Sequence, residues 1–226
     1  MVNTKDAKDR KGLGYCFILL LLALLSACNA PQTLAPDQAH GLAISAWQRG
    51  WHGVWALNWQ ESPIVGPIIF EAWQTEAGQQ RRYEILESDV PALVGLTYIN
   101  DGEMAIHFNR LEPTAPAATG GPNLPFSPLS DAFDKITALL AKTPQSAQRQ
   151  AIDLPQGPGL QLTLTYPEKQ VLTLWLDITN NLIIQANLEA PGTHFTLRAR
   201  SLEGLSNPHP KLFEIPEHTA RRPDRF

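Results

Sequence analysis

The feature that most constrains this chain is a series of short segments in which apolar and polar residues alternate. In the first of them Trp51, Trp55, Leu57 and Trp59 occupy odd positions, and most of the positions between them are small or polar. A period of two places the four apolar side chains on one face of a β-strand. A chain made of many such segments has to bury one face of an antiparallel sheet, so the sequence predicts a mostly β fold.

Strands of this kind follow one another with turn signals between them. Asn100-Asp101-Gly102, Asn180-Asn181 and Pro191-Gly192 stand between neighbouring segments, where a tight turn needs residues that tolerate positive φ. A short run over 212–216 is expected to be a closing edge strand or a cap. The other predicted strands cover 68–74, 82–87, 95–99, 103–109, 160–166, 171–178, 182–189 and 193–201.

Two helices interrupt this pattern. Leu42, Ala43, Ala46 and Trp47 recur at helical spacing, and Gly50 ends that segment. A loop rich in proline and glycine over 111–127 precedes the second helix, for which Ser127 is the expected N-cap and Pro128 the first position. The apolar stripe of this second helix consists of Leu129, Phe133, Ile136 and Leu140.

About ten antiparallel strands and two helices predict a single domain of the mostly β (α+β) class. An open sheet of that size twists and curls, so we expect one curved antiparallel sheet or half-barrel, with the two helices as a lid on the concave face. Two short helices do not fill a concave face of that width, which favours a large apolar cavity beneath them.

The start of the chain predicts export. Lys5, Lys8, Arg10 and Lys11 precede an apolar run, which is the layout of a secretory signal peptide. The run is shorter than a membrane-spanning helix requires, which argues against the alternative of an uncleaved anchor. It ends in Leu25-Ser26-Ala27-Cys28, which resembles the bacterial lipobox and makes Cys28 the predicted lipidation site.

These boundaries predict four parts: a lipoprotein signal peptide over 1–27, a tether over 28–37, a folded domain over 38–217 and a basic tail over 218–226. Two or three acyl chains on Cys28 would hold the domain on a membrane surface. The predicted location is the cell envelope, on the outer face of the cytoplasmic membrane or on the outer membrane.

Composition excludes several functions. The net charge is −4 and no basic stripe runs along the chain, so nucleic acid is not an expected partner. No motif for nucleophilic, nucleotide-binding or zinc-dependent chemistry is present. The six histidines are scattered and are interpreted as surface or sheet-edge residues, and Glu84 and Glu87 are expected on opposite faces of one strand. We therefore expect a protein that is not an enzyme and has no cofactor or metal.

The order of elements resembles the bacterial lipoprotein carrier and receptor superfamily, the LolA/LolB-like fold. The resemblance rests on a helix before an aromatic first strand, on Arg82-Tyr83-Glu84, on Asn100-Asp101-Gly102, and on the loop and helix that interrupt the strands. It continues with Leu174-Trp175-Leu176-Asp177 before Asn180-Asn181-Leu182, and with Phe213-Glu214-Ile215-Pro216. It implies a noncatalytic binding protein, although the typical soluble carrier has no lipobox.

The expected function is binding of an apolar ligand, the acyl chains of a lipid or of an acylated protein, in lipoprotein or lipid trafficking. The alternative is a protein-interaction or envelope-stress sensor module with a filled core and an envelope protein as partner. An ordinary packed core is the competing interpretation of the aromatic residues. The predicted ligand-binding residues are Trp51, Trp55, Leu57, Trp59, Phe70, Met104, Ile106, Phe108 and Trp175.

Overall fold

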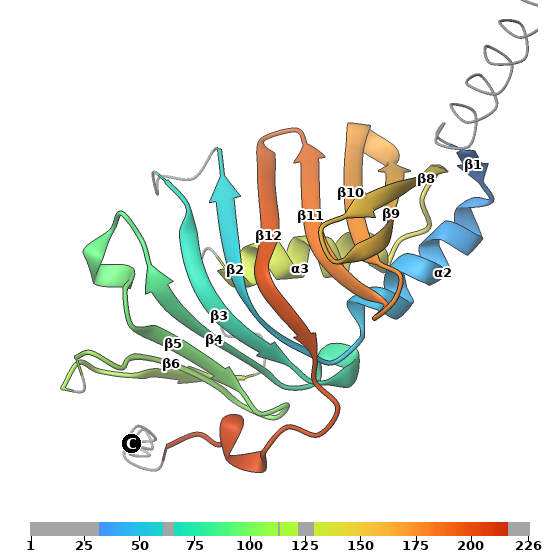
Figure 1. Ribbon diagram of the computed structural model, residues 1–226. Helices are drawn as coiled ribbons and strands as arrows, with labels where there is room; N and C mark the ends of the chain where they lie inside the picture. Colours follow the sequence, from blue (N-terminus) through green and yellow to red (C-terminus); the bar gives the residue numbers. More distant parts are fainter. Residues whose placement is uncertain (1–31, 61–65, 113, 122–128, 217–226) are drawn as a thin grey trace, which may run out of the picture.

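The computed structural model describes residues 32–60, 66–112, 114–121 and 129–216. They form one curved antiparallel sheet of 12 strands in the order β1-β8-β9-β10-β11-β12-β2-β3-β4-β5-β6-β7 (Figure 1). The strands are β1 (Gln32–Leu34), β2 (Trp51–Trp59), β3 (Ile68–Gln74), β4 (Arg81–Glu87), β5 (Leu96–Asn100), β6 (Ala105–Asn109), β7 (Ala118–Gly120), β8 (Ser146–Leu154), β9 (Gly157–Tyr166), β10 (Gln170–Asp177), β11 (Leu182–Ala190) and β12 (Thr193–Gly204).

Apart from the edge strand β1, which pairs with β8, the sheet consists of two meanders joined in the middle. Strands β2 to β7 form one meander and β8 to β12 the other, and pairing of β12 with β2 joins them. The chain therefore has to pass from one edge of the sheet, at β7, to the opposite part, at β8. Helix α3 (Leu129–Leu140) lies in this connection and crosses the concave face behind the strands in Figure 1.

The second helix, α2 (Pro36–Trp47), packs beside β8, β9 and β11 and touches α3. Pro36 stands in its first turn, where its missing N–H costs no hydrogen bond. The predicted architecture, a curved antiparallel sheet with two helices on the concave face, is confirmed. The predicted tether overlaps it, because β1 pairs with β8 and α2 begins before residue 38.

The buried faces of the two helices follow the predicted periods with one difference. Leu129, Phe133, Ile136 and Leu140 of α3 are all buried, as predicted. In α2 the buried side chains are Ala39, Ala43, Ala46 and Trp47, whereas Leu42 is 43% exposed. Small residues at the buried positions let α2 approach the sheet closely, and the stripe they define leaves Leu42 outside it. Ser127 and Pro128 lie outside the described residues.

The convex face carries its own cover near β4, β5 and β6. Ile99 and Ile106 point to this side and are buried, and neither belongs to the concave-face core. The C-terminal run crosses here as a 3-10 turn, η4 (Pro210–Leu212), followed by buried Phe213. Of the two predictions for residues 212–216, the structure shows a cap rather than an edge strand.

Within the described ranges, no helix is both long and apolar enough to cross a membrane. The predicted signal peptide, Cys28 and the predicted tail over 218–226 lie outside them.

Candidate functional site

The concave face holds an aromatic cluster, and a single ring of α3 is at its centre. The ring centroid of Phe133 lies 5.2 Å from that of Tyr83, 5.6 Å from Trp47, 5.9 Å from Trp51 and 6.2 Å from Phe70. These residues come from α2, β2, β3 and β4, so Phe133 holds α3 to elements that are distant in sequence. The structure fills this place with a side chain rather than leaving it empty.

Four of the predicted ligand-binding residues meet in this cluster or beside it. Trp51, Trp55, Leu57 and Phe70 are all buried on the concave face, at 5%, 2%, 1% and 0% exposure. The rings of Trp51 and Trp55 meet edge to face at 5.2 Å. Trp59 lies further along β2, where it packs against Phe195 at 4.9 Å at the margin of the core.

The other predicted residues lie elsewhere. Ile106 and Phe108 occupy alternate positions of β6 that point to the convex face. Trp175 pairs with Gln161 and Gln185 and alternates with buried residues of β10, so it also points outward. Met104 precedes β6 and is 48% exposed. An apolar residue can lie on either face of a sheet, and its type alone does not show which. These four residues do not join the aromatic cluster.

A groove of about 330 Å³ opens between the two helices at the edge of the aromatic cluster. Ile44, Trp47 and Leu140 contribute its apolar walls. Hydrogen bonds connect the helices there: the Trp47 indole Nε1 donates to Thr137 Oγ1 at 3.1 Å, and His40 Nε2 lies 2.7 Å from the Leu140 carbonyl oxygen. Arg81 Nη1 of β4 reaches Asp134 of α3 at 3.6 Å. These polar interactions connect α3 to α2 and to β4.

The interior is strongly apolar, and this raises the pKa values of two buried tyrosines. Burial raises the pKa of Tyr83 to about 12, against the opposing effect of the Arg81 charge, and burial also raises the pKa of Tyr166 to about 12. Within the described part of the chain, Trp55 Nε1 and the Tyr166 hydroxyl are buried without a hydrogen-bond partner. Such polar atoms cost free energy, and an incoming polar group near them would recover part of it.

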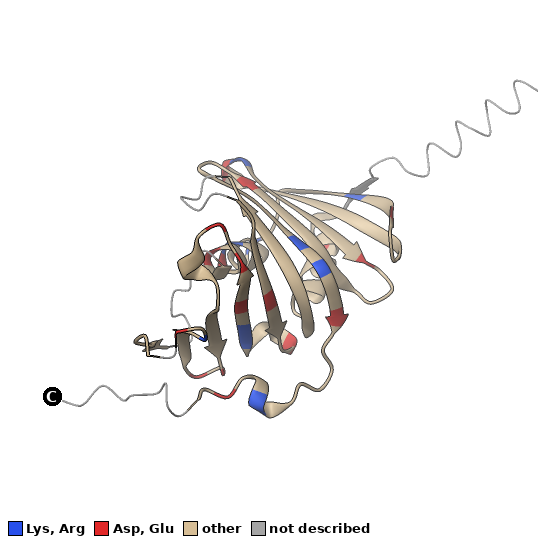
Figure 2. Ribbon diagram, turned by 60° about the vertical axis from the view of Figure 1, so that its left-hand side comes forward, with Lys and Arg blue, Asp and Glu red and all other residues tan. Residues whose placement is uncertain are grey.

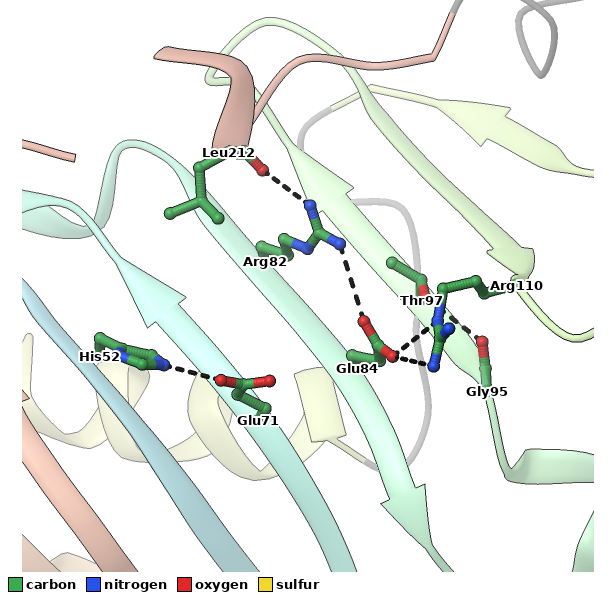
Figure 3. A network of polar contacts seen from close by, with 8 residues as sticks. All are labelled: His52, Glu71, Arg82, Glu84, Gly95, Thr97, Arg110 and Leu212. Atoms are coloured by element: carbon green, nitrogen blue, oxygen red, sulfur yellow. Dashed lines mark hydrogen bonds and ion pairs between the residues drawn. The ribbon is translucent and has the colours of Figure 1, made fainter. Parts of the chain in front are cut away.

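The convex face carries a network of charged and aromatic side chains, and Figure 3 shows the polar contacts of His52, Arg82 and Glu84 within it. His52 lies between two carboxylates, with its Nε2 2.8 Å from Glu71 and its Nδ1 2.8 Å from Glu203. Its ring stacks on Trp73 at 4.9 Å, and the Arg82 guanidinium lies 5.4 Å from the Trp73 ring centroid. His52 thus lies on the convex surface and is partly exposed, which agrees with a surface histidine, and its strand is central rather than at an edge.

Burial opposes a charge on His52, but the hydrogen bonds to Glu203 and Glu71 outweigh it and raise its pKa above 6.5. No local sequence pattern reveals this site, because His52, Glu71 and Glu203 come from three different strands. The pairing of β2 with both β3 and β12 creates the site: it places Glu203 and Trp73 directly opposite His52 and Glu71 diagonally beside it.

The carboxylates of β4 are paired with arginines. Glu84 lies 2.7 Å from Arg110 and 3.7 Å from Arg82, and Glu87 lies 3.9 Å from Arg200. A register shift places Glu87 opposite Ile69, on the same side of the sheet as Glu84, so the prediction of opposite faces is wrong. Among the residues that the structure describes, no group of three or more His, Cys, Asp or Glu is arranged to hold a metal ion.

Comparison with models of known protein families gives no match, and comparison with curated proteins gives none either. Among solved structures, the chain is similar to an uncharacterized conserved protein from Thermus thermophilus, with a TM-score of 0.53 and 9% identity over 81% of this chain and 96% of that one. The chain shares that fold. At this identity the likeness concerns the fold alone.

Weaker likenesses occur to MucB of Pseudomonas aeruginosa in its complex with MucA, with a TM-score of 0.48 and 14% identity over 81% of this chain and 61% of that one. A LolA superfamily protein from Nitrosomonas europaea has a TM-score of 0.40 and 10% identity over 80% of this chain and 98% of that one. At these TM-scores neither protein informs the function of this chain.

Proposed function

We propose that this protein is a membrane-anchored, noncatalytic binding protein for an apolar ligand, the acyl chains of a lipid or of an acylated protein. The observation that carries the proposal is the aromatic cluster of the concave face, which one side chain of one helix closes. Lipids on Cys28 would place the domain in the cell envelope, at a membrane surface from which such a ligand comes.

In this proposal Phe133 stands where the ligand binds. Its ring packs against rings from four other elements, so moving α3 outward would uncover a continuous apolar surface. An acyl chain that took this place would gain about 0.8 kcal/mol of favourable transfer free energy for each buried methylene. An acyl chain of ordinary length therefore offsets the free energy that is lost when one phenyl ring leaves the cluster.

The groove between α2 and α3 is the proposed entrance. It borders Trp47, whose ring packs against Phe133 at 5.6 Å, so a ligand in the groove is adjacent to the ring it has to displace. The polar interactions of Arg81 with Asp134 and of Trp47 with Thr137 would break as α3 moves. In this proposal α3 is a lid, and the structure corresponds to its closed state.

The test is binding of a fluorescent fatty acid to the purified domain and to two phenylalanine variants. Phe133→Ala removes the proposed plug and is expected to strengthen probe binding about tenfold. Phe195→Ala is the matched control, because Phe195 is equally buried, at 1% exposure, but packs on Trp59 away from the cluster. Absence of probe binding in the parent and in Phe133→Ala, or equal gains in both variants, would contradict the proposal.

The alternative function is a protein-interaction or envelope-stress sensor module, and the convex face supports it. A row of Glu203, His52, Trp73 and Arg82 crosses four neighbouring strands on this face, and Glu71 lies diagonally beside His52. Mass spectrometry of the protein purified from its membrane separates the two functions. Co-purified lipid supports the ligand proposal, whereas a co-purified envelope protein without lipid supports the alternative.

A further inference from the structure

A second pocket, of about 460 Å³, lies against the outward-facing residues of β10, β11 and β12. It is separate from the aromatic cluster, because Trp175, Gln185 and Arg198 on its floor point away from the concave face. The tip of the β8–β9 hairpin, with Leu154, Pro155 and Gln156, forms one wall. Figure 1 shows this hairpin passing in front of the neighbouring strands.

Two irregularities of the sheet shape the pocket. A register shift in the β10–β11 pair leaves Ile184 without a cross-strand partner, between the pairs Trp175–Gln185 and Leu176–Ile183. A second shift, in the β12–β2 pair, leaves Arg200 without a cross-strand partner on β2. Both extra residues line the pocket. A β-bulge re-aims side chains locally, and bulges are frequent beside functional sites. Two bulges on neighbouring strand pairs that open into one pocket point to a built site.

The pocket combines two cations with an aromatic ring. Arg198 and Arg200 lie on the same stretch of β12, and Figure 2 shows two basic positions in succession along that strand. Asp177, the acidic residue of the lining, keeps its charge, and its two oxygens accept hydrogen bonds from the Thr179 and Asn180 amides and from the Asn180 side chain. The two arginines of the lining therefore outnumber its one carboxylate. The nearest carboxylate of Arg200 is that of Glu87, at 3.9 Å.

The remaining lining adds apolar surface. Leu154 and Ile184 supply aliphatic contacts, Trp175 presents an indole, and Gln185 stands between Trp175 and Arg198 in the cross-strand row. Guanidinium groups bind phosphate and carboxylate through paired N–H donors, and an indole accommodates a flat apolar group. This set of side chains recognises a molecule with one charged end and one apolar body.

We propose that this convex-face pocket binds a small organic anion, a phosphate or carboxylate attached to an apolar or aromatic body. Arg198 and Arg200 bind the charged end, and Trp175 with Ile184 contacts the body. The site is independent of the lid function of α3. The anion can come from a free small molecule or from a lipid headgroup, and both present the same chemistry to the two arginines.

The experiment titrates the full domain with phenyl phosphate in a calorimeter, with benzyl alcohol as the uncharged probe. We expect phenyl phosphate to bind and benzyl alcohol to bind at least tenfold more weakly. Arg198→Gln and Arg200→Gln are each expected to lose tenfold or more in affinity, and Trp175→Leu about fivefold. The matched control is Arg49→Gln, an exposed arginine outside this pocket, which should bind like the parent.

A second arm separates the two sources of the anion. Vesicles of phosphatidylcholine with one fifth phosphatidic acid are sedimented with the same variants. Binding to phenyl phosphate alone identifies a free anion, and vesicle binding that Arg198→Gln abolishes identifies a headgroup. Arg198→Lys, which keeps the charge and the fold, should retain part of the binding. Equal losses in Arg49→Gln and Arg198→Gln, or no binding to either probe, would overturn the proposal.

Discussion

At the residue scale, His52 links stability to pH. Its pKa is raised in the folded protein, so the charged imidazolium with Glu71 and Glu203 stabilises the fold fully below the unfolded pKa of about 6.5. This contribution is lost as the pH rises through the folded-state pKa. We expect His52→Gln to lower the melting temperature more at pH 5.5 than at pH 8.5, by an amount that corresponds to about 0.5 kcal/mol, which is typical of partly exposed ion pairs.

The control for this prediction is His107→Gln. Burial lowers the pKa of His107, so its substitution should not produce a larger loss at low pH. Thermal melts of both variants and the parent at the two pH values provide the comparison. A loss in His52→Gln that is equal at pH 5.5 and 8.5 would show that the two carboxylates do not bind a charged imidazole.

Trp55 provides a second prediction at this scale. It is 2% exposed and packs edge to face on Trp51, so Trp55→Ala leaves a large cavity in the closed protein. We expect a loss of about 3–5 kcal/mol in the free energy of unfolding, measured by denaturant titration. Trp73→Ala, on the partly exposed convex stack with His52, should cost much less. Similar losses for both tryptophans would contradict the assignment of Trp55 to the core.

At the scale of elements, the sequence pattern predicts the strands that alternate cleanly and misses those that do not. The range 68–74 matches β3 at both ends, because apolar residues and bounding turn signals coincide there. The sequence does not predict strand β8: its residues are SAQRQAIDL, and Ala147 is its one buried side chain, because its other positions are exposed or half-buried on both faces. Its position follows from pairing with β1 and β9, which no local pattern shows.

Candidate site residues are predictable from sequence where they share one strand and are not where they lie on distant strands. Trp51, Trp55 and Leu57 share one strand, so their common face follows from the period of two. Grouping Phe70 with them depended on the pairing of β2 with β3, which holds. Grouping Trp175 with them failed, because the face of a residue on a distant strand depends on register and on bulges rather than on residue type.

The attachment of α3 is testable through Thr137. Its hydroxyl accepts from Trp47 Nε1 and donates to the Phe133 carbonyl oxygen at 2.8 Å. Thr137→Val keeps the shape but leaves the indole N–H of Trp47 without an acceptor, which costs about 1–3 kcal/mol. We expect faster amide hydrogen exchange in α3 and unchanged exchange in β10. Thr163→Val, at an outward position of β9, is the control, and equal effects in both variants would show that the bond does not hold the lid.

At the scale of the whole molecule, the two faces of one sheet carry different chemistry. The concave face is aromatic and closed by α3, and the convex face carries arginines, carboxylates and a pocket of about 460 Å³. A twelve-stranded sheet separates them, so a ligand on one face has no direct contact with a ligand on the other. Variants of Phe133 are therefore expected to leave phenyl phosphate binding unchanged, and variants of Arg198 to leave fatty-acid binding unchanged.

Attachment to a membrane is also a property of the whole molecule, and it depends on Cys28. The Leu25-Ser26-Ala27-Cys28 ending predicts cleavage before the cysteine and acylation of its thiol and amine. Each buried acyl methylene contributes about 0.8 kcal/mol, so two or three acyl chains hold the domain firmly on the membrane. The described part of the chain has no helix that spans a bilayer.

We expect Cys28→Ser to abolish lipidation and to leave unprocessed precursor, seen as a larger band by immunoblot and as loss of metabolic labelling with palmitate. Cys16→Ser, inside the predicted leader, is the matched control and should be processed normally. A mature-sized, membrane-retained product of Cys28→Ser would contradict the predicted anchor and with it the proposed location of the binding protein.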